Sequence, residues 1–95
     1  MERYGMKRVH LIVSGDVQAV GYRAWVVRQA KELGLSGWVK NRDDGAVEIV
    51  AEGPKTRLEE LANRCRGGPD VAWVEHVDVR WGRATGEYVT FEVVY

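Results

Sequence analysis

The sequence predicts one α+β domain in which two helices pack on one face of a mainly antiparallel sheet of four to five strands. Two segments repeat apolar residues at steps of three and four, the period of an amphipathic helix. Other segments alternate apolar and polar residues, as half-buried strands do. The patterns follow one another in the order β-α-β-β-α-β-β, which is typical of the split β-α-β arrangement.

Length and composition favour a single domain without bulk affinity for polyanions. The chain has 95 residues, 45% of them apolar, and its 14 Lys and Arg balance 14 Asp and Glu. Zero net charge gives no general attraction for nucleic acid or anionic lipid. With one cysteine, no long apolar run and no secretory leader pattern, we expect a cytoplasmic protein without membrane contact. We also expect a monomer, although no feature of the sequence reports the oligomeric state. We expect residues 1–7 to form a flexible segment and 8–95 to form the domain.

The first strand and first helix enclose a glycine-bounded loop. Residues 9–14 alternate as a strand that stops at Gly15, and residues 15–21 form the loop. The segment 22–33 places apolar side chains on one stripe, and Gly34 follows at the position where helices often end. On this stripe we expect Tyr22 to be a buried aromatic residue.

The middle of the chain reads as a hairpin followed by the second helix. Residues 36–41 and 46–52 are strand patterns joined by a turn whose Asp44-Gly45 pair supports positive φ. Pro54 can open a helix at its first position. An apolar stripe at i, i+3, i+4 and i+7 follows, made of Leu58, Leu61, Ala62 and Cys65.

Two further strand patterns finish the chain. Residues 73–81 alternate, with Val77, Val79 and Trp81 on the face predicted to point to the core. Residues 88–95 are rich in β-branched and aromatic residues and predict a short strand at a sheet edge. Together the elements predict the ferredoxin-like sandwich, a fold that hosts many functions, so function must be argued from a site.

The loop between the first strand and the first helix is the candidate site. It leads into a helix N-terminus, where free N–H groups and the positive end of the helix dipole attract anions. Arg23 lies in the first turn, where the dipole would favour an acid, so its position suggests a bound anion. The residues alone also allow a glycine-rich turn beside a solvated arginine.

Two motifs carry a resemblance to a known family. The stretch Gly15-x-Val17-Gln18-x-Val20-Gly21-Tyr22-Arg23 resembles the acylphosphatase signature Gly-x-Val-Gln-Gly-Val-Gly-Phe/Tyr-Arg. A second block, Gly37-Trp38-Val39-Lys40-Asn41-Arg42-x-Asp44-Gly45-x-Val47-Glu48, is similar to another motif of the same family. The resemblance extends over roughly residues 7–95.

The resemblance implies hydrolysis of the carboxyl-phosphate anhydride of an acyl phosphate, with inorganic phosphate as product and competitive inhibitor. It assigns Arg23 and Asn41 as catalytic residues, Asn41 holding the attacking water. It assigns phosphate binding to the loop residues Asp16, Val17, Gln18, Ala19, Val20, Gly21 and Tyr22. No metal and no cofactor are implied, because a carboxylate leaves without an acid catalyst and N–H donors with one guanidinium can neutralise the phosphoryl oxygens.

Two other functions stay open at this stage. A catalytically silent relative would keep the phosphate site without turnover. An RNA-binding module would share the fold, but such modules carry exposed aromatic residues on a central strand, whereas residues 46–52 contain none and include two acids. Hydrolysis of benzoyl phosphate separates the enzyme from both.

Ala19 and Tyr95 allow more detailed predictions about backbone geometry and side-chain pairing. Ala19 stands where the signature has Gly. We expect negative φ there, so that Ala19→Gly costs about 0.4–1 kcal/mol of stability with turnover little changed. The alternative is a strained Ala19, in which case the glycine variant would be faster and more stable. At the chain end, we expect the carboxylate of Tyr95 to pair with Arg23.

Overall fold

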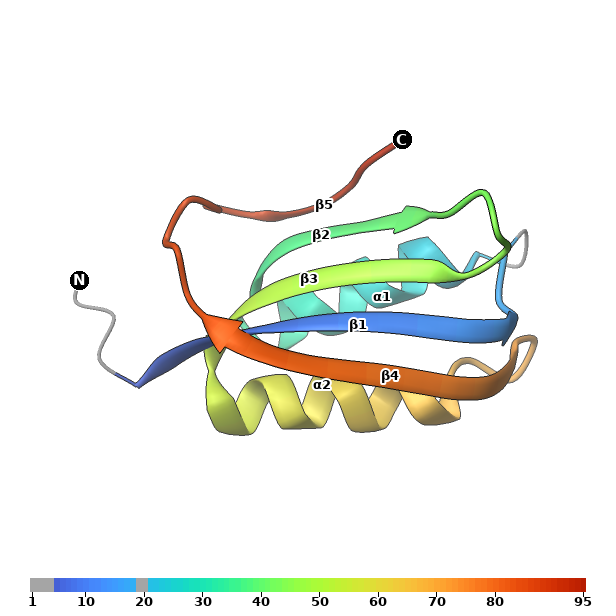
Figure 1. The fold of residues 1–95 in the computed structure, drawn as a ribbon, viewed down its shortest axis with the longest axis horizontal. Coiled ribbons are helices and arrows are strands. Elements are labelled where there is room, and N and C mark those ends of the chain that lie inside the picture. Colours follow the sequence, from blue (N-terminus) through green and yellow to red (C-terminus); the bar gives the residue numbers. More distant parts are fainter. Residues whose placement is uncertain (1–4, 19–20) are drawn as a thin grey trace.

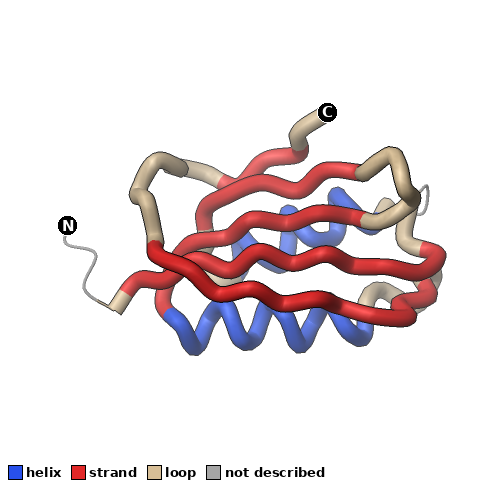
Figure 2. The backbone as a smooth tube through the Cα atoms, in the orientation of Figure 1, coloured by secondary structure: helices blue, strands red, loops and turns tan. Residues whose placement is uncertain are grey.

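The computed structural model describes residues 5–18 and 21–95, and two helices cover one face of a five-stranded sheet (Figures 1 and 2). In chain order the elements are β1 (Met6–Asp16), α1 (Tyr22–Glu32), β2 (Ser36–Asn41), β3 (Val47–Pro54), α2 (Lys55–Gly67), β4 (Trp73–Arg83) and β5 (Phe91–Val93). The order of element types is the one predicted. No helix among the described residues is long and apolar enough to cross a membrane.

The sheet has the strand order β4-β1-β3-β2-β5. The β1/β3, β1/β4 and β2/β3 pairs are antiparallel, whereas β5 pairs with β2 in parallel. The parallel edge brings the C-terminus alongside the end of β2, as the ribbon shows (Figure 1). The ferredoxin-like arrangement predicted from the sequence is therefore confirmed.

The core lies between the sheet and the two helices. Its strand contribution comes from alternate residues of β1 and β3, such as Val9, Leu11 and Ile49, which are fully buried. The helices supply the predicted stripes, including Val26 of α1 and Leu61 of α2, both 0% exposed. Burial of these stripes holds α1 and α2 against one sheet face and fixes the start of α1 relative to the end of β2.

A buried carboxylate holds the long connection between β4 and β5. Glu52 is 3% exposed and accepts hydrogen bonds from the Thr85 N–H at 2.8 Å, the Thr85 hydroxyl at 3.0 Å and the Gly86 N–H at 2.9 Å. Burial alone would raise the pKa of Glu52, but these hydrogen bonds and the Arg8 charge outweigh it and hold the pKa below its usual value. The connection is thus fixed to the end of β3.

Several boundaries differ from the sequence prediction. β1 begins at Met6, so Met6 and Lys7 belong to the sheet, while residues 1–4 of the predicted flexible segment lie outside the described residues. β1 also continues past Gly15, because its pairing with β4 resumes there after a register shift. β5 is shorter than the predicted 88–95, because only residues 91–93 pair with β2.

Gly15 lies against the backbone of β4, next to the register shift between β1 and β4. Its φ is 131°, and a Cβ placed on it would overlap the backbone oxygen of Trp73. Only glycine fits this position without moving β4. The first glycine of the signature therefore shapes the strand that leads into the loop.

The prediction that Trp81 faces the core was wrong. Trp81 is 45% exposed, whereas Val77 and Val79 on the same side of β4 pack against the core. The alternation of β4 places the indole on the helix side of the sheet. However, β4 is an edge strand, and Trp81 lies near the end of the sheet at which α2 begins, so the helix covers the indole only in part. Trp73, at the start of the same strand, is also exposed, at 68%.

Candidate active site

The start of α1 forms the positively polarised part of the site. Gly21 occupies the N-cap position with φ 77°, and neither a side-chain cap nor an acidic residue in the first turn satisfies the first amides of the helix. Such amides bind anions. Gly21 adopts the left-handed conformation freely, whereas another residue would be strained there. Ala19 and Val20 lie outside the described residues, so the negative φ expected at Ala19 stays a prediction.

A small hollow of about 160 Å³ opens beside this helix start. Both residues predicted to be catalytic, Arg23 and Asn41, line it. They come from different elements, α1 and β2, and are joined here by the packing of the helix on the sheet. The other lining residues are Val17, Gly21, Tyr22, Ala24, Val93 and Tyr95.

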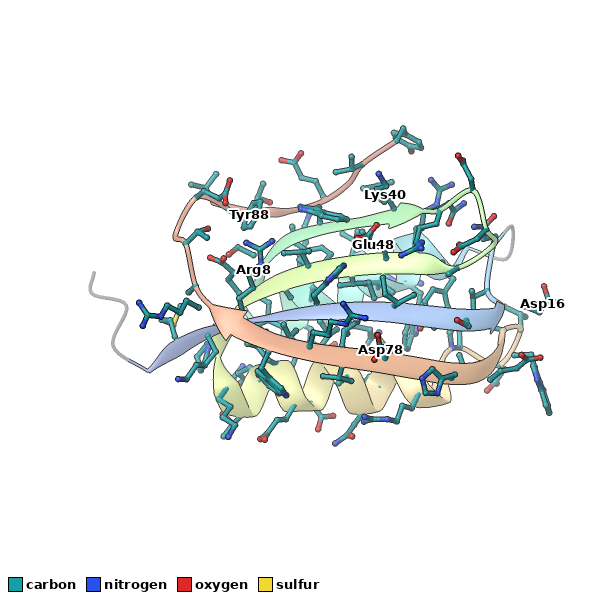
Figure 3. The ribbon with its side chains drawn as sticks, in the orientation of Figure 1. Arg8, Asp16, Lys40, Glu48, Asp78 and Tyr88 are labelled. Atoms are coloured by element: carbon teal, nitrogen blue, oxygen red, sulfur yellow. The ribbon has the colours of Figure 1, made fainter. Side chains whose placement is uncertain are left out.

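The predicted loop residues divide into two groups. Val17, Gly21 and Tyr22 line the hollow, and Val17 is fully buried beneath it. Asp16 and Gln18 do not line it; Asp16 is exposed at the end of β1, at the loop end of the sheet (Figure 3).

Gln18 instead joins the loop to the turn between β2 and β3. Its side-chain amide donates to the backbone oxygens of Arg42 at 2.8 Å and of Ala46 at 3.0 Å. Because Asn41 directly precedes this turn, Gln18 fixes the loop relative to Asn41. The signature glutamine is thus a positioning residue in this structure.

The turn itself is held by Asp44. Its carboxylate accepts from the Ala46 N–H at 3.0 Å and from the Arg42 guanidinium at 2.9 Å. The bond from Ala46 and the pairing with Arg42 lower the pKa of Asp44. The run 42–44 is a turn, as predicted from the sequence, and it holds the end of β2 in place.

Asn41 presents an unpartnered acceptor. Its Oδ1 is buried, and no hydrogen-bond partner for it exists among the described residues. A buried amide oxygen without a partner costs free energy, about 1–3 kcal/mol for a typical group. Because Asn41 lines the hollow, this oxygen is suited to accept a hydrogen bond from a molecule bound there.

Arg23 is half-buried and lies against the C-terminal residue. Its guanidinium carbon is 5.2 Å from the centroid of the Tyr95 ring, a cation–π contact. The predicted pairing with the Tyr95 carboxylate is not among the ion pairs of the described residues. The Val94 N–H donates to the Val39 oxygen at 2.8 Å, and the last residue then places its ring over Arg23.

Tyr22 and Cys65 form a buried structural contact behind the site. The Tyr22 hydroxyl donates to the Cys65 backbone oxygen at 3.1 Å, and Tyr22 is 1% exposed, which confirms the predicted buried aromatic residue. Burial raises the pKa of the Tyr22 hydroxyl, and burial also raises the pKa of the Cys65 thiol to about 12. Both groups therefore stay protonated, and the Tyr22 hydroxyl joins α1 to α2 through the Cys65 backbone oxygen.

Sequence reasoning missed part of the lining. Ala24 could have been found from its place after Arg23 in the first helical turn. Val93 and the Tyr95 ring reach the hollow because β5 runs parallel to β2, and a parallel pairing between distant segments leaves no mark in local periodicity.

Known proteins resemble this chain over nearly its whole length. The acylphosphatase family model matches residues 9–93. An acylphosphatase of Methylococcus capsulatus is 52% identical over 89 residues, covering 94% of this chain and 97% of its own.

Two solved structures give the same result. The acylphosphatase of Bacillus subtilis superposes with a TM-score of 0.90 at 39% identity, covering 94% of this chain and 99% of its own. That of Coxiella burnetii gives 0.91 at 35% identity, covering 99% and 98%. These matches confirm the resemblance and the predicted activity, hydrolysis of acyl phosphates. The chain belongs to the acylphosphatase family.

Proposed function

We propose that the hollow between α1 and β2 hydrolyses acyl phosphates by direct in-line attack of water on phosphorus, without a metal ion. The single observation that carries this proposal is the meeting of Arg23, Asn41 and the uncapped start of α1 around one hollow. The phosphoryl group occupies the hollow, and the acyl group extends to solvent.

Arg23 and the amides at the start of α1 hold the phosphoryl oxygens. A guanidinium presents a planar fork of donors that matches two phosphate oxygens. The loop amides and the helix dipole add positive potential on the same side. Charge that develops on the equatorial oxygens in the transition state is therefore neutralised by groups already in place.

Asn41 holds the attacking water. Its unpartnered Oδ1 accepts one hydrogen from the water, and its amide N–H can donate to a phosphoryl oxygen. One side chain thus fixes the water relative to phosphorus, and such positioning supplies much of the rate in phosphoryl transfer. Gln18 donates to the backbone oxygens of Arg42 and Ala46 and so holds the loop in place relative to β2, which carries Asn41.

The departing carboxylate needs no acid. An acyl phosphate releases a weakly basic carboxylate as the P–O bond breaks, while the water oxygen forms the new bond and its protons pass to the released products. Arg23 and the amides take the place that a divalent ion has in many phosphoryl-transfer sites. Inorganic phosphate occupies the same hollow and competes with substrate.

The working unit is a monomer, and its location is the cytoplasm. Arg23 and Asn41 come from α1 and β2 of the same chain and line one hollow, so the proposed site is formed within one molecule. The one cysteine is buried as a thiol and fits a reducing compartment.

Hydrolysis of benzoyl phosphate by the purified chain tests the proposal. We expect turnover that is unchanged by EDTA and competitively inhibited by inorganic phosphate. A chain that binds phosphate without turnover would be the silent relative. Turnover lost with EDTA and restored by a divalent cation would contradict the metal-free mechanism.

A further inference from the structure

The exposed Trp81 lies between two hollows far from the active site. One, of about 340 Å³, is lined by Lys7, Lys55, Trp81, Gly82 and Arg83. The other, of about 400 Å³, is lined by Glu59, Ala62, Asn63, Arg66, Val79 and Trp81. Trp81 is the one residue common to both, so the indole borders both spaces.

The first hollow, which we call the basic hollow, gathers three cations from three elements. Lys7 and Arg83 are directly paired across β1 and β4, and alternation places both on the helix side of the sheet, like Val9 and Trp81. Lys55 is the first residue of α2, and its ammonium lies 5.9 Å from the centroid of the Trp81 ring. Among the described residues, 5–18 and 21–95, no acidic side chain lines this hollow.

Such an arrangement is unfavourable without an anion. Like charges directly opposite each other on neighbouring strands destabilise a sheet. A lysine in the first turn of a helix also opposes the helix dipole. Ion pairs within 4.0 Å join other cations of the described chain, such as Arg64 and Arg80, but none involves Lys7, Lys55 or Arg83. The charge of the basic hollow is therefore complementary to a ligand that carries several negative charges.

The exposed Trp81 indole favours a ligand that carries a flat aromatic ring. Large aromatic side chains at a surface provide stacking platforms for planar groups. The second hollow beside Trp81 offers Asn63 and Glu59, whose polar groups can hydrogen-bond the edge of such a ring. A ligand that fits both hollows carries an aromatic ring at one end and phosphates at the other.

We infer that Trp81 and the basic hollow form a second ligand site that binds a nucleoside di- or triphosphate. The phosphates lie among Lys7, Lys55 and Arg83, and the base stacks on Trp81. The site is separate from the hydrolytic one: Lys7 and Asp16 lie at opposite ends of β1, roughly 30 Å apart at about 3.3 Å per residue. In Figure 3, Arg8, the neighbour of Lys7, and Asp16 mark these two ends.

Calorimetric titration of the full chain with ATP at low salt, in EDTA, tests the site. We expect binding that inorganic triphosphate reproduces about tenfold more weakly, because it lacks the base. Trp81→Ala should weaken ATP binding by about the same factor, and Lys55→Gln and Arg83→Gln should each weaken both ligands. Because Lys55 and Arg83 are exposed, these two variants keep the fold even if Trp81→Ala does not.

Three variants serve as matched controls. Trp73→Ala removes another exposed indole from the same strand, 68% exposed against 45% for Trp81, and Arg80→Gln removes a cation from the other face of that strand. Arg23→Ala disables the hydrolytic hollow. All three should bind ATP like the parent chain.

Other results would overturn the inference. These are no ATP binding at millimolar concentration, equal affinity for triphosphate and ATP, loss of binding in Arg23→Ala, or equal losses in Trp73→Ala and Trp81→Ala. A short single-stranded RNA that binds more tightly than ATP would also overturn the assignment to free nucleotide.

Discussion

Replacing Gln18 by alanine should uncouple the phosphate loop from the turn that follows Asn41. The side chain donates two hydrogen bonds, at 2.8 and 3.0 Å, across 24 and 28 positions of sequence. No other side-chain hydrogen bond of the described residues joins the loop to this turn. The consequences should therefore appear both in stability and in catalysis.

The structure limits the size of the stability loss. The Ala46 oxygen also accepts the Arg42 N–H at 2.8 Å, and the Arg42 oxygen accepts the Gly45 N–H at 3.2 Å. Neither carbonyl is left without a partner, so each lost bond costs only its net value of about 0.5–1.5 kcal/mol. Two bonds together give about 1–3 kcal/mol, or a Tm lowered by roughly 4–24 °C for a domain of this size.

Catalysis should suffer more than stability suggests. If the loop shifts by about 1 Å relative to Asn41, turnover can fall by up to about 10²-fold. Thermal melts and benzoyl phosphate kinetics measure the two effects. Gln18→Glu should lose at least as much as the alanine variant, because its carboxylate donates no hydrogen bond and faces the two carbonyl oxygens. Parental stability and turnover in both variants would refute the reasoning.

The remaining predictions concern the core, the buried carboxylate and the chain end. Leu61→Ala should lower the free energy of unfolding by about 2–5 kcal/mol in urea titrations while the folded fraction keeps its kinetics, because Leu61 is fully buried away from the hollow; a cost below about 1 kcal/mol would contradict the packing. Because the pKa of Glu52 is lowered in the folded state, its carboxylate stabilises the folded protein at pH values above the usual glutamate pKa. This stabilisation is lost as the pH falls through the lower pKa of the folded state. The stability difference between the parent and Glu52→Gln should therefore shrink in urea titrations below about pH 4.5, whereas a difference that grows toward acid would show that the pKa is raised. Tyr95→Ala should weaken phosphate inhibition about two- to fivefold, the value of an exposed cation–π contact with Arg23, while a short C-terminal extension leaves it unchanged; the reverse pattern would restore the carboxylate pairing.

The sequence predicted the elements well because their signals are local. The stripe that contains Leu61 needs only the period of one helix, and the turn at Asp44-Gly45 needs only its own residues. Arg23 and Asn41 were found through motifs and line the same hollow. Their catalytic roles remain predictions until the kinetics are measured.

The features that the sequence did not reveal depend on pairings between distant segments. Alternation placed Trp81 on the correct side of β4 but could not show that α2 leaves this position uncovered. The ring of Tyr95 reaches Arg23 only because β5 joins β2 in parallel. The bonds of Gln18 to the far turn, at 24 and 28 positions of separation, have no local signature either.

The division of labour between Arg23 and Asn41 is tested most directly by measuring phosphate inhibition and turnover in Arg23→Ala and Asn41→Ala side by side. Loss of the guanidinium should abolish phosphate affinity and turnover together, because the phosphoryl group loses its charged partner. Loss of the Asn41 side chain should leave the phosphate inhibition constant within about threefold while kcat falls about 10²-fold or more, as for loss of a positioned polar group. Full activity in either variant, or equal loss of phosphate affinity in both, would contradict the account.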